Sequence, residues 1–141
     1  MYLSTRDMAR LRVLMLRECN WNGKQLEPKD WCRYIARPIT PFHEMNPLSL
    51  RALGRPDRWG YGALWWVWDE PVWPGNEYGT PFQGAHSAMR PGGQYITVLP
   101  SAYMVIAHKV DIDHPTAQVT NTEYDSILQM VIASACLGTC R

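Results

Sequence analysis

Five of the chain's seven tryptophans lie in one short stretch, between Trp59 and Trp73. This stretch, WGYGALWWVWDEPVWPG, combines large aromatic side chains with glycine and proline turns. An indole ring buries a large apolar area, and its N–H needs an acceptor when it leaves water. A chain of 141 residues forms one small domain, which has a limited interior for five such rings. We therefore expect part of this aromatic surface to contact a second molecule.

The composition is typical of a folded globular chain. Hydrophobic residues make up 46% and charged residues 19%, which excludes wholesale disorder. Eleven prolines predict long irregular connections rather than a bundle of continuous helices. We expect a single domain over residues 1–141, with loop-rich segments at 38–60 and 71–94.

Two segments have the periodicity of amphipathic helices. Near the N-terminus, Ser4 or Thr5 can cap a helix over residues 5–18 that carries Asp7 in its first turn. Near the C-terminus, residues 120–122 can cap a helix that ends at Gly138. This second helix has an apolar stripe formed by Ile127, Leu128, Val131, Ile132 and Ala135.

The segments between the helices predict a sheet. Strands are expected at Ala63–Trp68, Tyr95–Leu99 and Ala102–Ile112. A further short strand is expected at Trp31–Ala36, and a two-turn helix at residues 47–54. The predicted fold class is α+β: a small antiparallel sheet flanked by N-terminal and C-terminal helices, with long Pro/Gly-rich loops.

The aromatic run has three interpretations. Trp66 and Trp68 can fill the core while Trp65 covers a neighbouring loop, as most tryptophans of small domains are structural. Alternatively, indoles of the run can anchor a protein interface, because aromatic residues and arginines are enriched at binding hot spots. The third interpretation is a platform that stacks a sugar or a nucleobase. The interface residues predicted from these patterns are Trp59, Trp65, Trp68, Trp73, Arg55 and Arg58.

Charge divides the chain into two unlike halves. Residues 1–58 hold eleven Lys and Arg against six Asp and Glu (+5), whereas residues 59–141 hold three against seven (−4). An acidic protein surface, or the acidic half of another copy, fits the basic half. Nucleic acid is weakly supported, because +5 over 58 residues is a low charge density. We expect protein partners in a homo- or hetero-oligomer.

The segment from His108 to His114 offers one candidate metal site. In an extended chain, Asp111 and Asp113 point to the same side, about 7 Å apart, and His114 lies close by. Such ligands would serve metal-assisted hydrolysis. The simpler interpretation is the solvent face of a strand, so no cofactor is predicted.

The cysteines and the N-terminus bear on localisation. Cysteines 19, 32, 136 and 140 are too few and too unevenly spaced for a disulfide scaffold, and buried or incidental thiols are favoured over a zinc site. No uninterrupted apolar signal core and no stretch of eighteen apolar residues is present. We expect a protein without a membrane span that works inside the cell or within an assembled particle.

No catalytic motif stands out, which weighs against an enzyme without excluding one. The leading hypothesis is a non-enzymatic structural or interaction subunit of a larger assembly, such as a viral particle or another multi-subunit complex, docked through its aromatic surface. Two alternatives stay open: a small metal-dependent hydrolase at Asp111, Asp113 and His114, and a ligand-binding module built on the tryptophan platform.

Overall fold

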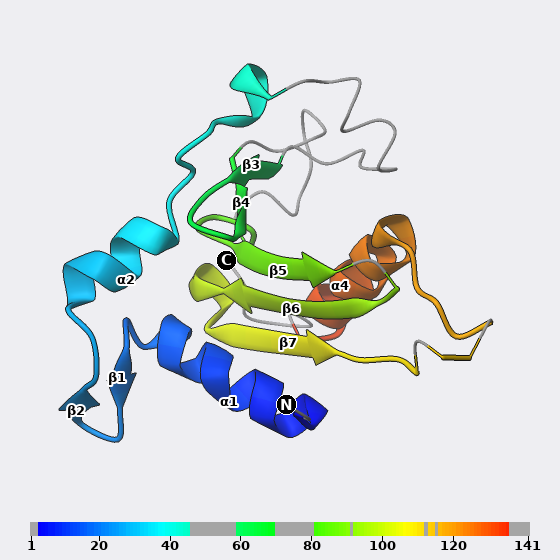
Figure 1. The fold of residues 1–141 in the computed structure, drawn as a ribbon, viewed down its shortest axis with the longest axis horizontal. Coiled ribbons are helices and arrows are strands. Elements are labelled where there is room, and N and C mark those ends of the chain that lie inside the picture. The colour runs from blue at the N-terminus through cyan, green and yellow to red at the C-terminus, as the bar shows by residue number, and fades with distance from the viewer. Residues whose placement is uncertain are drawn as a thin grey trace.

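The fold was analysed in a computed structural model of the chain, which describes residues 3–45, 59–69, 81–90, 92–111, 113–114 and 116–135. These residues form a mixed α+β fold with two antiparallel sheets (Figure 1). The predicted fold class is therefore confirmed. Among the described residues, no helix is long and apolar enough to cross a lipid bilayer.

The elements follow one another along the chain in the order helix, hairpin, helix, sheet, helix. The helices are α1 (Thr5–Leu16), α2 (Lys29–Ile35) and α4 (Asn121–Ala135), with short 3-10 turns at Phe42–Glu44 and Pro100–Ala102. The strands are β1 (Asn20–Trp21), β2 (Lys24–Gln25), β3 (Trp59–Tyr61), β4 (Trp66–Trp68), β5 (His86–Arg90), β6 (Gln94–Leu99) and β7 (Met104–His108).

The larger sheet is an antiparallel meander in the order β3-β4-β5-β6-β7. Its longest ladders join β5 to β6 and β6 to β7, with Thr97 opposite both Ser87 and Ile106. By contrast, β4 pairs with β5 at only two positions, Trp66 with Ser87 and Val67 with His86. The part of β5 from Ala88 to Arg90 therefore extends beyond the end of β4.

Helices cover the two faces of this sheet. On one face α4 places Tyr124, Leu128 and Ile132 in the main core, against strand residues that include Tyr95 and Leu99. On the other face α1 lies across β6 and β7 and directs Arg12 toward Trp65 (Figure 1). The result is a three-layer arrangement of helix, sheet and helix.

The local sequence explains both of these helices. Ser4 and Asp7 form a capping box, in which the Ser4 side chain accepts from the Asp7 N–H and the Asp7 carboxylate accepts from the Ser4 N–H. Thr120 and Glu123 make the same reciprocal bonds before α4. The predicted helices at 5–18 and after residues 120–122 are confirmed.

Other predicted boundaries are corrected. Residues 31–36, expected as a strand, belong largely to α2, which starts after Pro28 with Asp30 in its first turn. The first three residues of the strand predicted at Ala63–Trp68 form the turn between β3 and β4 instead. The last predicted strand ends at His108 rather than Ile112. The helix predicted at 47–54 and Gly138 lie outside the described residues.

Candidate functional site

Trp59 and Trp65 are interior side chains. Their exposed fractions are 1% and 8%, and Trp68 is half-buried. In the single chain, Trp59 and Trp65 therefore do not offer an exposed ring, and the interface role of these two residues stays a prediction. Trp73, Arg55 and Arg58 lie outside the described residues, so the docking role predicted for them stays a prediction.

The hairpin of β3 and β4 explains why these rings fit inside a small domain. Trp59 and Trp68 face each other across the hairpin and meet edge to face, with ring centroids 5.2 Å apart. Trp68 also stacks on Phe82 at 4.7 Å. Aromatic rings packed against one another share a single interior volume, so the core accommodates more of them than their separate areas suggest.

Trp65 is directed to the opposite face by the turn that precedes it. Leu64 adopts a left-handed conformation, with φ 64°, and its side chain is 84% exposed. Trp65 then lies beneath α1, where the Arg12 guanidinium carbon stands 3.6 Å from the centre of the indole ring. His86 meets the same ring edge to face at 5.0 Å. We call Arg12, Trp65 and His86 the interior cation cluster.

The interior cation cluster has unsatisfied polar atoms. His86 Nδ1 lies 3.1 Å from the Gly84 carbonyl and donates to it, which leaves Nε2 as an acceptor. Neither His86 Nε2 nor Arg12 Nε has a partner among the described residues. Burial lowers the pKa of His86, and the Arg12 charge lowers it further against the Gly84 hydrogen bond. Burial also lowers the pKa of Arg12 to about 10. Both groups are therefore costly to charge in place.

A pocket lies beside the part of β5 that extends beyond the end of β4. It has a volume of about 260 Å³, and Ala88, Met89 and Arg90 of β5 form one side of it. The turn before β4, the neighbouring strands and the first half of α1 complete the lining, with Met8, Tyr61, Leu64, Trp66, Gln94 and Ile96. The walls are thus largely apolar and aromatic, and Arg90 contributes a cation.

The pocket lining suits binding better than bond cleavage. Among the described residues that line it there is no Ser, Cys, His, Asp, Glu or Lys, and the hydroxyl of Tyr61 is the one side-chain O–H group. The Gln94 amide nitrogen donates to the Val110 carbonyl at 2.8 Å, which fixes that side chain and leaves its oxygen as an acceptor. Described residues thus supply the pocket with a cation and an aromatic wall, but not with a nucleophile and base pair.

Ser87 belongs to the structural interior. Its hydroxyl lies 2.8 Å from the Thr97 hydroxyl, which in turn lies 2.8 Å from the Tyr124 hydroxyl. All three residues are fully buried, and burial raises the pKa of Tyr124. The chain of hydroxyls joins β5 and β6 to α4 and satisfies polar groups within the core.

The residues of the candidate metal site lie beyond the last strand of the sheet. Asp111, Asp113 and His114 follow the end of β7 in a turn, where Asp111 accepts from the Asp113 N–H and His114 contacts Thr116. Across the described parts of the chain, no three His, Cys, Asp or Glu side chains are grouped as metal ligands. Because the strand ends at His108, the extended geometry behind this prediction is missing.

Two of the cysteines are paired. Cys19 and Cys32 form a disulfide between the end of α1 and α2, with Cα atoms 6.1 Å apart. The sequence left open whether these cysteines are free or paired, and folding brings together two that are 13 positions apart. The other two cysteines lie outside the described residues.

Few features of the sequence mark the pocket and the interior cation cluster. Arg12 lies on a helix with other arginines, and nothing in the pattern distinguishes it from its exposed neighbours. The strand β5 was missed because Ser87, Ala88 and Arg90 have no strong strand preference. The glycine pair that follows it, Gly92 and Gly93, has positive φ and marks the hairpin to β6.

The fold is similar to that of a solved hydrolase structure. A structure from Bacillus anthracis named "Putative 6-aminohexanoate-dimer hydrolase" shares 28% sequence identity with this chain and superposes with a TM-score of 0.56. The similarity covers 93% of this chain but only 28% of that one, so the present chain spans little more than a quarter of its length. No protein-family model and no curated protein matches the sequence.

Proposed function

We propose that this chain is a non-catalytic binding part of a larger hydrolase-like assembly. It would form one wall of a ligand site, while a second chain would supply the reacting groups. The observation that carries this proposal is the pocket beside β5, whose described lining has an aromatic wall and a cation but no nucleophile and base pair. The similarity to 28% of a chain named as a putative hydrolase supports placing this chain as one part of a larger hydrolase-like whole.

The pocket chemistry fits a ligand with an apolar chain and an anionic end. Trp66, Tyr61 and Ile96 would contact methylene groups, and Arg90 would pair with a carboxylate. The dimer of 6-aminohexanoate, which the name of the similar hydrolase mentions, is a flexible chain of this kind with an amide at its centre. Linear amides with a terminal carboxylate are therefore the first ligand class to test.

Titration of the isolated chain with the 6-aminohexanoate dimer tests this proposal. Tryptophan fluorescence should change on binding, and Arg90→Gln should weaken binding by about tenfold to a hundredfold, because a charge-assisted hydrogen bond contributes on the order of 1.5–3 kcal/mol. Arg10→Gln, on the exposed side of α1, is the matched control and should bind as the wild type does. The isolated chain should release no free amine from the dimer; hydrolysis at an enzymatic rate would contradict a non-catalytic role.

Docking through an aromatic surface is a second candidate function, and α2 favours it. Trp31 and Tyr34 are 52% and 45% exposed and stack with ring centroids 5.7 Å apart. Exposed, preorganised aromatic pairs are typical of interface hot spots. Under this proposal the assembly partner covers α2 as well as the predicted interface residue Trp68. Quenching of Trp31 by iodide should fall when the complex forms, and unchanged quenching would argue against it.

A further inference from the structure

The segment from Asn20 to Ile35, here called the arm, contains β1, β2 and α2 and projects beyond the sheet (Figure 1). Within α2 the single buried residue is Cys32, which is bonded to Cys19. A helix of seven residues is not stable in isolation and needs tertiary packing to persist. For α2, that packing is centred on the disulfide.

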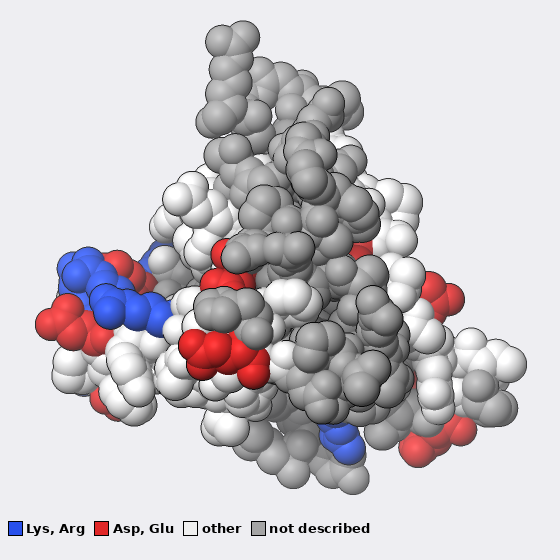
Figure 2. All heavy atoms as spheres, turned by 90° about the horizontal axis from the view of Figure 1, so that it is seen from above, with Lys and Arg blue, Asp and Glu red and all other residues white. Residues whose placement is uncertain are grey.

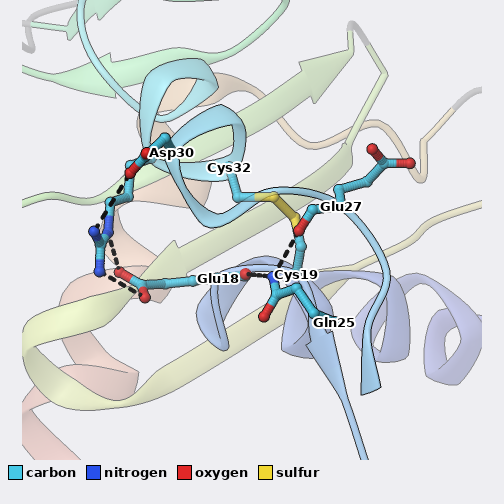
Figure 3. Close-up of polar contacts among 7 residues, drawn as sticks. Glu18, Cys19, Gln25, Glu27, Asp30 and Cys32 are labelled. Atoms are coloured by element: carbon cyan, nitrogen blue, oxygen red, sulfur yellow. Dashed lines mark hydrogen bonds and ion pairs between the residues drawn. A yellow bond between two sulfur atoms is a disulfide. The ribbon is translucent and has the colours of Figure 1, made fainter. Parts of the chain in front are cut away.

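Polar side-chain contacts also join the arm to Glu18 at the end of α1 (Figure 3), beside the backbone hydrogen bond from the Leu26 N–H to the Cys19 carbonyl. Arg33 forms two hydrogen bonds to the Glu18 carboxylate, at 2.7 and 3.0 Å, and both side chains are substantially exposed. The Gln25 amide donates to the Glu18 carbonyl at 2.7 Å. Exposed ion pairs of this kind contribute little, because water and salt screen them.

The backbone at this junction also needs external support. Glu18 and Cys19 have φ values of 50° and 65°, in the left-handed region that residues with a Cβ rarely adopt. Such conformations persist when surrounding contacts fix them. A covalent bond from Cys19 to α2 is the strongest contact at this position.

We propose that Cys19 and Cys32 form a reversible thiol–disulfide site that fixes the arm and presents the stacked Trp31 and Tyr34. Reduction by a dithiol breaks the Sγ–Sγ bond: the two cysteines gain two electrons and two protons, and the dithiol loses them to become a disulfide. With the bond broken, α2 loses its one buried anchor and frays, while the sheet and its two covering helices stay folded. The aromatic surface on α2 is therefore available in the oxidised state.

Limited trypsin digestion tests this proposal in a Cys136→Ala/Cys140→Ala background, which leaves only the Cys19 and Cys32 thiols. Cleavage after Lys29 and Arg33 reports on the arm, and cleavage after Arg12 of α1 and after Lys109 at the end of β7 reports on the sheet and its covering helix. Dithiothreitol should speed cleavage in the arm by about tenfold or more and leave the sheet sites unchanged. Alkylation followed by mass measurement should find both thiols blocked before reduction and free after it.

Two variants complete the design. Cys19→Ser/Cys32→Ser in the same background should reproduce the fast cleavage without dithiothreitol, with a circular dichroism spectrum that still shows the folded sheet. Glu18→Gln removes the ion pair but keeps the disulfide, and it should retain slow cleavage when oxidised.

Three results would overturn the proposal. The first is free Cys19 and Cys32 thiols in air-oxidised protein. The second is an arm that stays protected after reduction, or sheet sites that become equally sensitive. The third is a pair that stays fully oxidised in every mixture of reduced and oxidised glutathione, since a reversible site must populate both states.

Discussion

A buried arginine without a carboxylate partner is costly, and Arg12 is such a residue among the described ones. Its guanidinium lies over the Trp65 ring, so the indole quadrupole replaces part of the lost hydration. The aliphatic stem meanwhile packs α1 onto the sheet. Arg12 therefore stabilises the fold through its contact area as well as through its charge.

Substitutions of Arg12 should separate these two contributions. Arg12→Ala removes both the stem and the cation–π contact, and it should lower the free energy of unfolding by roughly 1–3 kcal/mol. Arg12→Met keeps the stem volume and removes a desolvated charge, so its stability should stay within about 1 kcal/mol of the wild type. Urea denaturation measures both variants. Equal losses of stability in Arg12→Ala and Arg12→Met would show that Arg12 stabilises the fold through its charge rather than through its packing.

His86 should make stability depend on pH. Burial, reinforced by the Arg12 charge, holds its pKa below the ordinary value of 6.5. Between that lowered value and pH 6.5 the unfolded chain binds more protons than the folded chain. This contribution to stability is therefore complete above about pH 6.5 and is lost as the pH falls through the lowered pKa. Denaturation curves between pH 7.5 and 5 should show the decline.

The matched variants are His86→Gln and His114→Gln. His86→Gln should flatten the pH dependence of the free energy of unfolding below pH 6.5, because it removes the buried imidazole. His114→Gln replaces an exposed histidine after β7, and it should leave the slope of stability against pH unchanged. A slope that survives in His86→Gln would assign the effect to another group.

At the scale of elements, the sequence predicted the helices that carry their own signals. Capping residues and apolar stripes are local, and both α1 and α4 were found from them. The helix α2 was mistaken for a strand because Trp31, Cys32 and Tyr34 favour strands, and its anchor is a disulfide to a distant residue. The pocket could not be predicted either, since it depends on how far β4 pairs along β5.

Gly62 lies in the turn between β3 and β4, where it packs closely against the backbone at the end of α2 and just after it. A Cβ at this position would lie 2.5 Å from the Arg37 carbonyl oxygen and 3.1 Å from the Ile35 carbonyl oxygen. Gly62→Ala must therefore displace the backbone after α2, and it should cost roughly 1–3 kcal/mol of stability. It should also speed hydrogen exchange at the Thr40 and Tyr61 amides, which bond to each other's carbonyls at 2.8 Å.

Gly23→Ala is the control for this prediction. An added Cβ there meets nothing within 4 Å, although φ is +86°. Gly23→Ala should lower stability only through the strained backbone conformation, by about 1–2 kcal/mol. Hydrogen exchange at the Thr40 and Tyr61 amides should not change. Faster exchange at these amides in both variants would show general destabilisation instead of a local displacement.

At the scale of the whole molecule, charged side chains are spread unevenly over the face shown in Figure 2. Basic side chains gather with acidic ones at the end where the arm lies, whereas acidic side chains also lie near the middle and at the opposite end. The net charges of the two halves of the sequence, +5 and −4, would favour heterologous, head-to-tail contacts between copies. The arm also presents exposed aromatic side chains, so two kinds of attraction could hold an assembly.

Light scattering after size-exclusion chromatography should distinguish these two attractions. The screening length is about 10 Å at 0.1 M salt and about 3 Å at 1 M. If charge holds copies together, the mass should exceed that of the 16.2 kDa chain at low salt and return to it at 1 M salt. If the aromatic surface of α2 holds them, the larger mass should persist at 1 M salt and disappear in Trp31→Ala/Tyr34→Ala. A chain that is monomeric at high protein concentration in both salts does not self-assemble, and its partner must then be a different protein.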